Sequence, residues 1–144
     1  MKLSYKILNE IADYMEAGFK CFVHKKTHEI IAIPDENRFP GTDLNDEENA
    51  WAADIRKIDE NPDYIEIDSM ESSDSFRVME DFALSLPEGA TKIRLLTVLE
   101  GHKPFANFNH QIHNAGKERE QWFKLRREQE IEWLKNQLGS RNEL

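Results

Sequence analysis

Three histidines in the second half of the chain have the spacing best suited to metal binding. His110 and His113 lie three positions apart on a predicted helix and would share one face of it. Together with His102 or Glu100 they could supply three ligands. The zinc-protease pattern instead needs two histidines at i and i+4 with a general-base Glu between them, and this segment lacks it. We predict no metal and no cofactor, and take His102, His110 and His113 as the residues that a metal-dependent enzyme would use.

Other residue types that perform chemistry occur without the neighbours that would activate them. Cys21, the single cysteine, lies in an apolar strand-like segment and is expected to be buried and inert. His24 and His28 flank a short polar loop and are expected to be solvated. Acid–base catalysis needs a desolvated carboxylate. Adjacent carboxylates occur at Asp35/Glu36, Glu47/Glu48, Asp59/Glu60 and Glu80/Asp81. Of these pairs, only Glu80/Asp81 lies between apolar residues. Nothing else in the sequence singles out a desolvated carboxylate, so we predict no catalytic residue.

The net charge of −9 is concentrated in the middle of the chain. Residues 35–81 contain 16 acidic and 4 basic residues, whereas residues 90–144 contain 10 basic and 7 acidic ones. One interpretation is a polarised surface that binds a basic partner. The simpler interpretation is that these residues form a solvated face. The candidate interaction surface consists of Asp46, Glu47, Glu48, Asp54, Asp59 and Glu60.

The last predicted helix carries the basic residues that a nucleic-acid interface would need. These are Lys117, Arg119, Lys124, Arg126, Arg127 and Lys135. Acidic residues lie three or four positions away from many of them, as in intrahelical ion pairs. The basic residues of a nucleic-acid-binding helix would have fewer acidic neighbours. We therefore keep nucleic acid as an alternative partner and not as the favoured one.

The elements that must position these residues follow from hydrophobic periodicity. Apolar residues at helical spacing predict a first helix over residues 3–16, followed by strands over 19–23 and 30–33 joined as a hairpin. A helix over about 45–60, with Asn45 and Glu48 as a capping box, precedes a strand over 64–68. Four helices follow: one ends at Pro87, one at Gly101, one starts at Pro104, and the last spans about 117–138.

These elements predict an α+β fold with a small three-stranded antiparallel sheet and about six helices, four of them consecutive at the C-terminus. The length of 144 residues predicts a single domain over 1–144. Its parts would be residues 1–68, with the sheet and the acidic helix, and residues 69–140, the helical half. No run of about 20 apolar residues occurs, the start does not resemble a signal peptide, and there is one cysteine. We therefore expect a cytoplasmic protein that makes no membrane contact.

The second half resembles a family of uncharacterised bacterial proteins, number 0158 in the UPF series. The resemblance rests on an ordered set of apolar residues: Met79, Phe82, Gly101, Phe105, Phe108, Trp122, Phe123, Trp133 and Leu134. It covers residues 70–136 well and residues 5–35 loosely, and it implies a small bacterial cytosolic protein of unassigned activity. At helical spacing, such residues usually form a core and not a cofactor site, and we expect this here.

We therefore favour a small non-enzymatic interaction or regulatory protein, because an acidic middle segment occurs without a catalytic constellation. The alternatives are a nucleic-acid-associated factor that uses the last helix and a metal-dependent enzyme that uses the three histidines. The sequence indicates neither the partner nor the oligomeric state.

Overall fold

The computed structural model describes residues 2–46 and 48–142, and its contacts divide the chain into two compact units. The first unit is formed by the residues up to Ser69 together with those from Ile131 onward, and the second by Met70–Glu130. The last helix, α6 (Gly116–Asn142), contributes residues to both.

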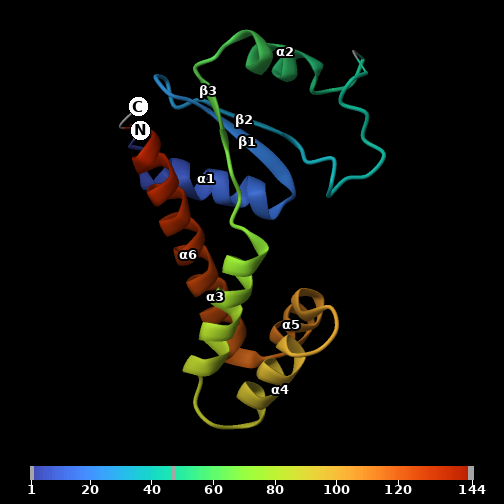
Figure 1. The fold of residues 1–144 in the computed structure, drawn as a ribbon, viewed down its shortest axis with the longest axis vertical. Coiled ribbons are helices and arrows are strands. Elements are labelled where there is room, and N and C mark those ends of the chain that lie inside the picture. The colour runs from blue at the N-terminus through green and yellow to red at the C-terminus, as the bar shows by residue number, and fades with distance from the viewer. Residues whose placement is uncertain (1, 47, 143–144) are drawn as a thin grey trace. The chain divides into compact units, whose positions relative to one another are not determined.

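A three-stranded antiparallel sheet lies at the centre of the first unit (Figure 1). Its strands are β1 (Phe19–His24), β2 (Ile30–Pro34) and β3 (Tyr64–Ile67), in the order β2-β1-β3. Cys21 pairs with Ala32 on one side and with Ile67 on the other. The predicted hairpin and third strand are confirmed.

One face of the sheet is covered by α1 (Tyr5–Glu16) and the C-terminal part of α6 (Figure 1). Helix α1 begins after Ser4, whose hydroxyl accepts a hydrogen bond from the backbone N–H of Ile7. Burial of Leu8 or Ile11 contributes roughly 1.5–3 kcal/mol each. The core on this face consists of Leu8, Ile11, Ala12, Cys21, Val23, Ile67, Ile131, Leu134 and Leu138.

The opposite face of the sheet is covered by α2 (Ala52–Glu60). Because side chains alternate along a strand, Ile31 and Ile33 point to this side, where Trp51, Ile55 and Ile58 pack against them. None of the residues of α2 is fully buried. This layer is therefore thinner than the one on the other face.

The acidic helix begins later than the sequence predicts, at Ala52 and not near residue 45. The Asp43 carboxylate accepts a hydrogen bond from the N–H of Asn45, and the Asp46 carboxylate accepts one from the N–H of Glu48. These turns take the backbone groups that a helix would use. The predicted capping box of Asn45 and Glu48 is wrong for this reason.

Gly18 connects α1 to β1 in a conformation that only glycine adopts easily. Its φ is +95°, and a Cβ atom at this position would lie 2.7 Å from Cε2 of Phe39. The Phe39 ring also lies 5.8 Å from the Phe19 ring, between centroids. The turn therefore depends both on backbone freedom and on the absence of a side chain.

The second unit consists of α3 (Ser72–Ser85), α4 (Ala90–Leu99), α5 (Pro104–His113) and the first part of α6. Trp122 is 1% exposed, and its ring centroid lies 5.3 Å from that of Phe82 and 4.9 Å from that of Phe108. The core consists of Met79, Phe82, Ala83, Leu86, Leu95, Leu99, Phe108, Ile112 and Trp122.

Over residues 2–46 and 48–142, the structure confirms the α+β class, with three antiparallel strands and six helices, the last four consecutive. Within the described residues, no helix combines the length and apolar character needed to cross a membrane.

Candidate functional site

The predicted acidic residues lie in the first unit, on α2 and in the turns before it. Asp59 and Glu60 are exposed and Asp54 is half-buried on the helix, and the exposed Asp46 and Glu48 precede it. Glu47 lies outside the described residues.

The orientation of α2 explains why its acidic residues reach solvent. Trp51, Ile55 and Ile58 form the stripe that faces the sheet, at the i, i+4 and i+7 spacing of one helix face. Asp59 and Glu60 follow this stripe at the end of the helix. The same apolar packing that holds α2 on the sheet therefore presents these carboxylates outward.

Some charges of this region are compensated at the edge facing the hairpin. Lys57 Nζ lies 2.7 Å from Glu29 Oε1. The hydrogen bond from Lys57 lowers the pKa of Glu29, and the same bond raises the pKa of Lys57. The Asp63 carboxylate lies 3.4 Å from Lys25 Nζ and 3.7 Å from Lys26 Nζ.

The carboxylates of Asp54, Asp59 and Glu60 have no such compensation. Among the residues that the structure describes, no Lys, Arg or His nitrogen lies within ion-pair distance of them. Their negative charge is therefore directed to solvent.

The hairpin brings His24 beside Asp63, but in an arrangement that is structural. The backbone N–H groups of Lys26 and Thr27 both donate to His24 Nδ1 at 3.1 Å. Nε2 is then the protonated nitrogen and faces the Asp63 carboxylate at 3.9 Å. These hydrogen bonds close the hairpin turn, so the imidazole takes part in holding the loop.

The histidines of the second unit do not converge. His102 lies in the turn before α5, and His110 and His113 are exposed on α5. The His113 ring packs against Phe123, with 5.8 Å between centroids. Over residues 2–46 and 48–142, no group of three His, Cys, Asp or Glu side chains has the arrangement of a metal site.

Two other predicted positions lack the environment that acid–base or nucleophilic chemistry needs. Glu80 and Asp81 are both exposed, so neither carboxylate is desolvated. Cys21 is fully buried, and its burial raises the thiol pKa to about 12. The thiol therefore stays protonated at neutral pH and is not a nucleophile.

Most residues of the shared apolar set lie in the cores. Met79, Phe82, Phe108, Trp122 and Leu134 are buried. Phe123 is half-buried, and so is Trp133, whose indole N–H donates to the backbone carbonyl of Asp68 at 3.1 Å. Gly101 and Phe105 are the exceptions to the predicted core. Gly101 lies in the exposed turn after α4, and Phe105, at the start of α5, is 36% exposed.

The arginines of α6 are largely engaged within the helix. Arg126 Nε lies 3.7 Å from Glu130 Oε1, and Arg127 Nε lies 3.6 Å from Glu130 Oε2. The guanidinium carbons of Arg119 and Arg126 lie 5.3 and 5.2 Å from the centre of the Phe123 ring. These contacts favour stabilisation of the helix over contact with phosphates.

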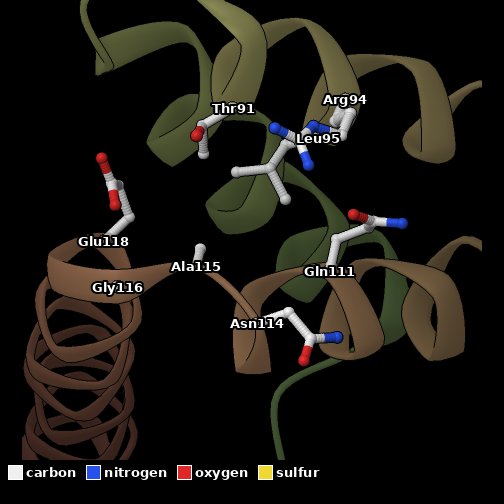
Figure 2. A pocket seen from close by; sticks show the side chains of 8 residues that line it. All are labelled: Thr91, Arg94, Leu95, Gln111, Asn114, Ala115, Gly116 and Glu118. Carbon is white, nitrogen blue, oxygen red and sulfur yellow. The ribbon is translucent and has the colours of Figure 1, made fainter.

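A small hollow in the second unit was not anticipated from the sequence. Figure 2 shows it between α4, α5 and the start of α6, and its volume is about 160 Å³. Its lining consists of Thr91, Arg94, Leu95, Gln111, Asn114, Ala115, Gly116 and Glu118. The helix break at Asn114–Gly116 is the one sequence signal that points to this place, since it brings two helix ends together beside α4.

Comparison with known proteins identifies a family. The model of an uncharacterised protein family (UPF0158) matches residues 41–141, which include the last four helices, the acidic helix and the third strand. No curated protein and no solved structure matches the chain.

Proposed function

The chain belongs to the uncharacterised protein family UPF0158, and we propose that it is a non-enzymatic protein whose acidic surface binds a basic partner protein. The proposed surface consists of Asp46, Glu48, Asp54, Asp59 and Glu60, in the turns before α2 and on the helix itself.

The observation that supports this proposal is the uncompensated charge of Asp54, Asp59 and Glu60. Neighbouring acids such as Glu29 and Asp63 have cationic partners within the unit, whereas these three do not. Asp59 and Glu60 lie in the last turn of α2, where the helix dipole disfavours negative charge, so leaving them unpaired disfavours the folded state. A partner that supplies Lys and Arg side chains would offset this penalty and would be steered toward the surface.

The test neutralises these three charges and compares the result with a matched control. The variant is Asp54→Asn/Asp59→Asn/Glu60→Gln. The control, Glu71→Gln/Glu80→Gln/Asp81→Asn, makes the same change in net charge at exposed positions of the second unit. Both are compared with the unmodified protein in affinity capture from the source organism, at about 50 mM salt, where surface charges are least screened.

We expect a reproducible basic protein that the unmodified protein and the control retain and the α2 variant loses. With the purified partner, three surface contacts worth about 0.5 kcal/mol each correspond to a roughly 10-fold loss of affinity. Equal retention by the α2 variant and the unmodified protein would contradict the proposal, and so would equal losses in the two variants.

A further inference from the structure

The hydrogen-bond pattern of the sheet shows which backbone groups of β2 point away from it. At the hairpin turn, the N–H of His24 donates to the carbonyl of Glu29. In an antiparallel pair, alternate residues turn their N–H and C=O groups toward the partner strand. Continuing from this bond along the register, Ile31 and Ile33 face β1. The backbone groups that point outward belong to Ile30, Ala32 and Pro34.

The opposite edge of the sheet, that of β3, is covered by α6. The N–H of Asp68, directly after β3, donates to Gln137 Oε1 at 2.8 Å. The Asp68 carbonyl accepts from Gln137 Nε2 at 2.9 Å and from Trp133 Nε1 at 3.1 Å. Within β3, the exposed Glu66 adds a charge, which disfavours pairing with another strand. Side chains of α6 therefore occupy the place of a further strand at this edge.

The edge of β2 has no comparable cover. Among the residues with a described structure, nothing outside the sheet forms a hydrogen bond with the N–H of Ile30 or of Ala32. Both residues are only half-buried, and the strand contains no charged residue. Pro34 removes one donor at the end of the strand and leaves these two N–H groups. An uncharged edge with unpaired backbone groups is a template for an added strand.

The charge of the first unit selects the strand that fits this edge. The second unit contains ten acidic and nine basic residues, so the first carries −8 of the net charge of −9. Asp35 directly follows β2, and α2 packs on β2 through Ile55 and Ile58. Pairing with a second copy would bring two units of −8 together, which like-charge repulsion disfavours. A segment that carries Lys and Arg has the complementary charge.

An exposed aromatic group lies at the Pro34 end of this edge. Phe39 is 39% exposed, and its ring packs on Phe19, which pairs with Pro34. Tyr14 is 42% exposed, and its ring centroid lies 6.2 Å from that of Phe19. Aromatic rings attract Lys and Arg cations and often anchor a partner. Together with Asp35, the aromatic group suits a cationic side chain at one end of an added strand.

We propose that the basic partner binds as an extended segment that adds a fourth strand to the sheet at the edge of β2. This inference rests on the proposed function and names the form that the partner takes. The backbone of the segment would form hydrogen bonds with Ile30 and Ala32. One of its Lys or Arg side chains would lie against Phe39, beside Asp35.

The test measures binding of a labelled peptide of about ten residues, in which valine and lysine alternate, to the full chain. Fluorescence anisotropy is recorded at about 50 mM salt, where charge contacts are little screened. The first control peptide is methylated on every backbone nitrogen, so it keeps its charge but cannot donate hydrogen bonds. In the second control peptide, glutamate replaces lysine.

Three variants of the protein locate the binding site. Ala32→Pro removes an outward N–H and leaves the bonds between β2 and β1 in place. Glu66→Pro is the matched control, because Glu66 has the corresponding outward position on β3. Phe39→Leu removes the exposed ring and keeps an apolar side chain. Thermal melts establish that each variant is folded, and the methylated peptide provides a test that needs no variant.

We expect the alternating valine–lysine peptide to bind, and the methylated and glutamate peptides to bind at least about 10-fold more weakly. Ala32→Pro should weaken binding roughly 10-fold, as the loss of a hydrogen bond to the added strand predicts. Phe39→Leu should weaken it about threefold through loss of the cation–π contact. Glu66→Pro should bind within about twofold of the unmodified protein. Hydrogen exchange at the amides of Ile30 and Ala32 should slow in the complex.

Equal affinities of the valine–lysine peptide and its methylated form would overturn the proposal, because they indicate charge attraction alone. Equal losses in Ala32→Pro and Glu66→Pro would also overturn it. A dimer of the unmodified protein in sedimentation, abolished by Ala32→Pro, would assign the edge to a second copy instead.

The same variants separate this inference from the proposed function. In the affinity capture, a basic protein that the α2 variant loses and Ala32→Pro retains would contradict only the added strand. Capture of no basic protein by the unmodified chain would contradict the proposed function itself.

Discussion

At the scale of single residues, burial determines what Cys21 can do. Its thiol pKa is raised from 9.0 to about 12, because the thiolate would be desolvated in the core. Between pH 9 and 12 the unfolded chain releases this proton and the folded chain retains it. The free energy of unfolding therefore falls as the pH rises above 9, by at most about 1.4 kcal/mol per pH unit.

Comparison with Cys21→Ala isolates this effect. From pH 8 to pH 10, urea titrations should show a loss of unfolding free energy that is about 1.4 kcal/mol larger for the unmodified protein than for the variant. Equal losses would show that the thiol does not titrate differently on folding. A thiol reagent should likewise react with Cys21 only when the chain unfolds.

Trp122 combines a large apolar contact with an unsatisfied polar atom. Its indole nitrogen is buried and has no hydrogen-bond acceptor among the described residues. Trp122→Ala should cost roughly 3–5 kcal/mol through the cavity it leaves. Trp122→Phe should cost less than half as much, because it retains an aromatic ring and removes a buried donor whose desolvation costs about 1–3 kcal/mol. Similar urea midpoints for the two variants would contradict this account.

At the scale of elements, the geometry of the hairpin turn predicts opposite effects on stability for substitutions of its two histidines. His24→Ala removes the acceptor of two backbone N–H groups and should cost about 1–2 kcal/mol. His28 has a φ of +63°, which disfavours a residue with a side chain. His28→Gly should be neutral or stabilise by up to about 1 kcal/mol. Thermal melts of the two variants check both signs, and destabilisation by His28→Gly would contradict the reading of the turn.

Helix α2 should be the least protected helix of the first unit. It has no fully buried residue, and the residue at its N-cap, Trp51, forms no side-chain capping bond. Helix α1, by contrast, buries Leu8, Ile11 and Ala12 and is capped by Ser4. Hydrogen exchange should therefore be faster for the amides of α2 than for those of α1. Equal protection would show that α2 opens only when the whole unit unfolds.

Hydrophobic periodicity predicted most helices and strands, because the apolar residues of each element recur with the period of that element. The start of α2 was the main error, since Asp43 and Asp46 direct their carboxylates to nearby backbone N–H groups and hold turns instead. Hydrophobic periodicity carries no information on this competition, in which side chains bind the backbone N–H groups that a helix would otherwise use. The hollow was also not predictable, because Arg94, Gln111 and Glu118 come from three helices whose packing the sequence does not specify.

At the scale of the whole molecule, α6 supplies residues to two different cores. Trp122 belongs to the core of the second unit, whereas Ile131, Leu134 and Leu138 belong to that of the first. Nine positions separate Trp122 from Ile131, which at about 100° per residue places the two side chains on opposite faces of the helix, so the single stripe predicted for this helix is in fact two stripes. The charge does not separate by unit in this way, since residues 70–130 contain ten acidic and nine basic residues.

Leu138→Ala tests the contribution of the end of α6 to the first unit. Leu138 is 1% exposed in the core that also contains Leu8 and Val23. The substitution should reduce the free energy of unfolding by about 2–5 kcal/mol. Lys135→Ala, at an exposed position of the same helix, is the control and should change it by less than about 0.5 kcal/mol. A Leu138→Ala effect as small as that of the control would place this segment outside the core.

The contact between Gly18 and Phe39 also has a consequence for how the sequence can change over generations. Replacing Phe39 by a small residue frees the space above Gly18, but the backbone there remains at a φ of +95°. A side chain at position 18 then still meets a penalty of roughly 1–2 kcal/mol. The order of substitutions is therefore constrained, because Phe39 can be lost while Gly18 stays, and the reverse order passes through a clash. Among descendants of a common ancestor, the glycine should occur without the phenylalanine, and the phenylalanine should not occur without the glycine.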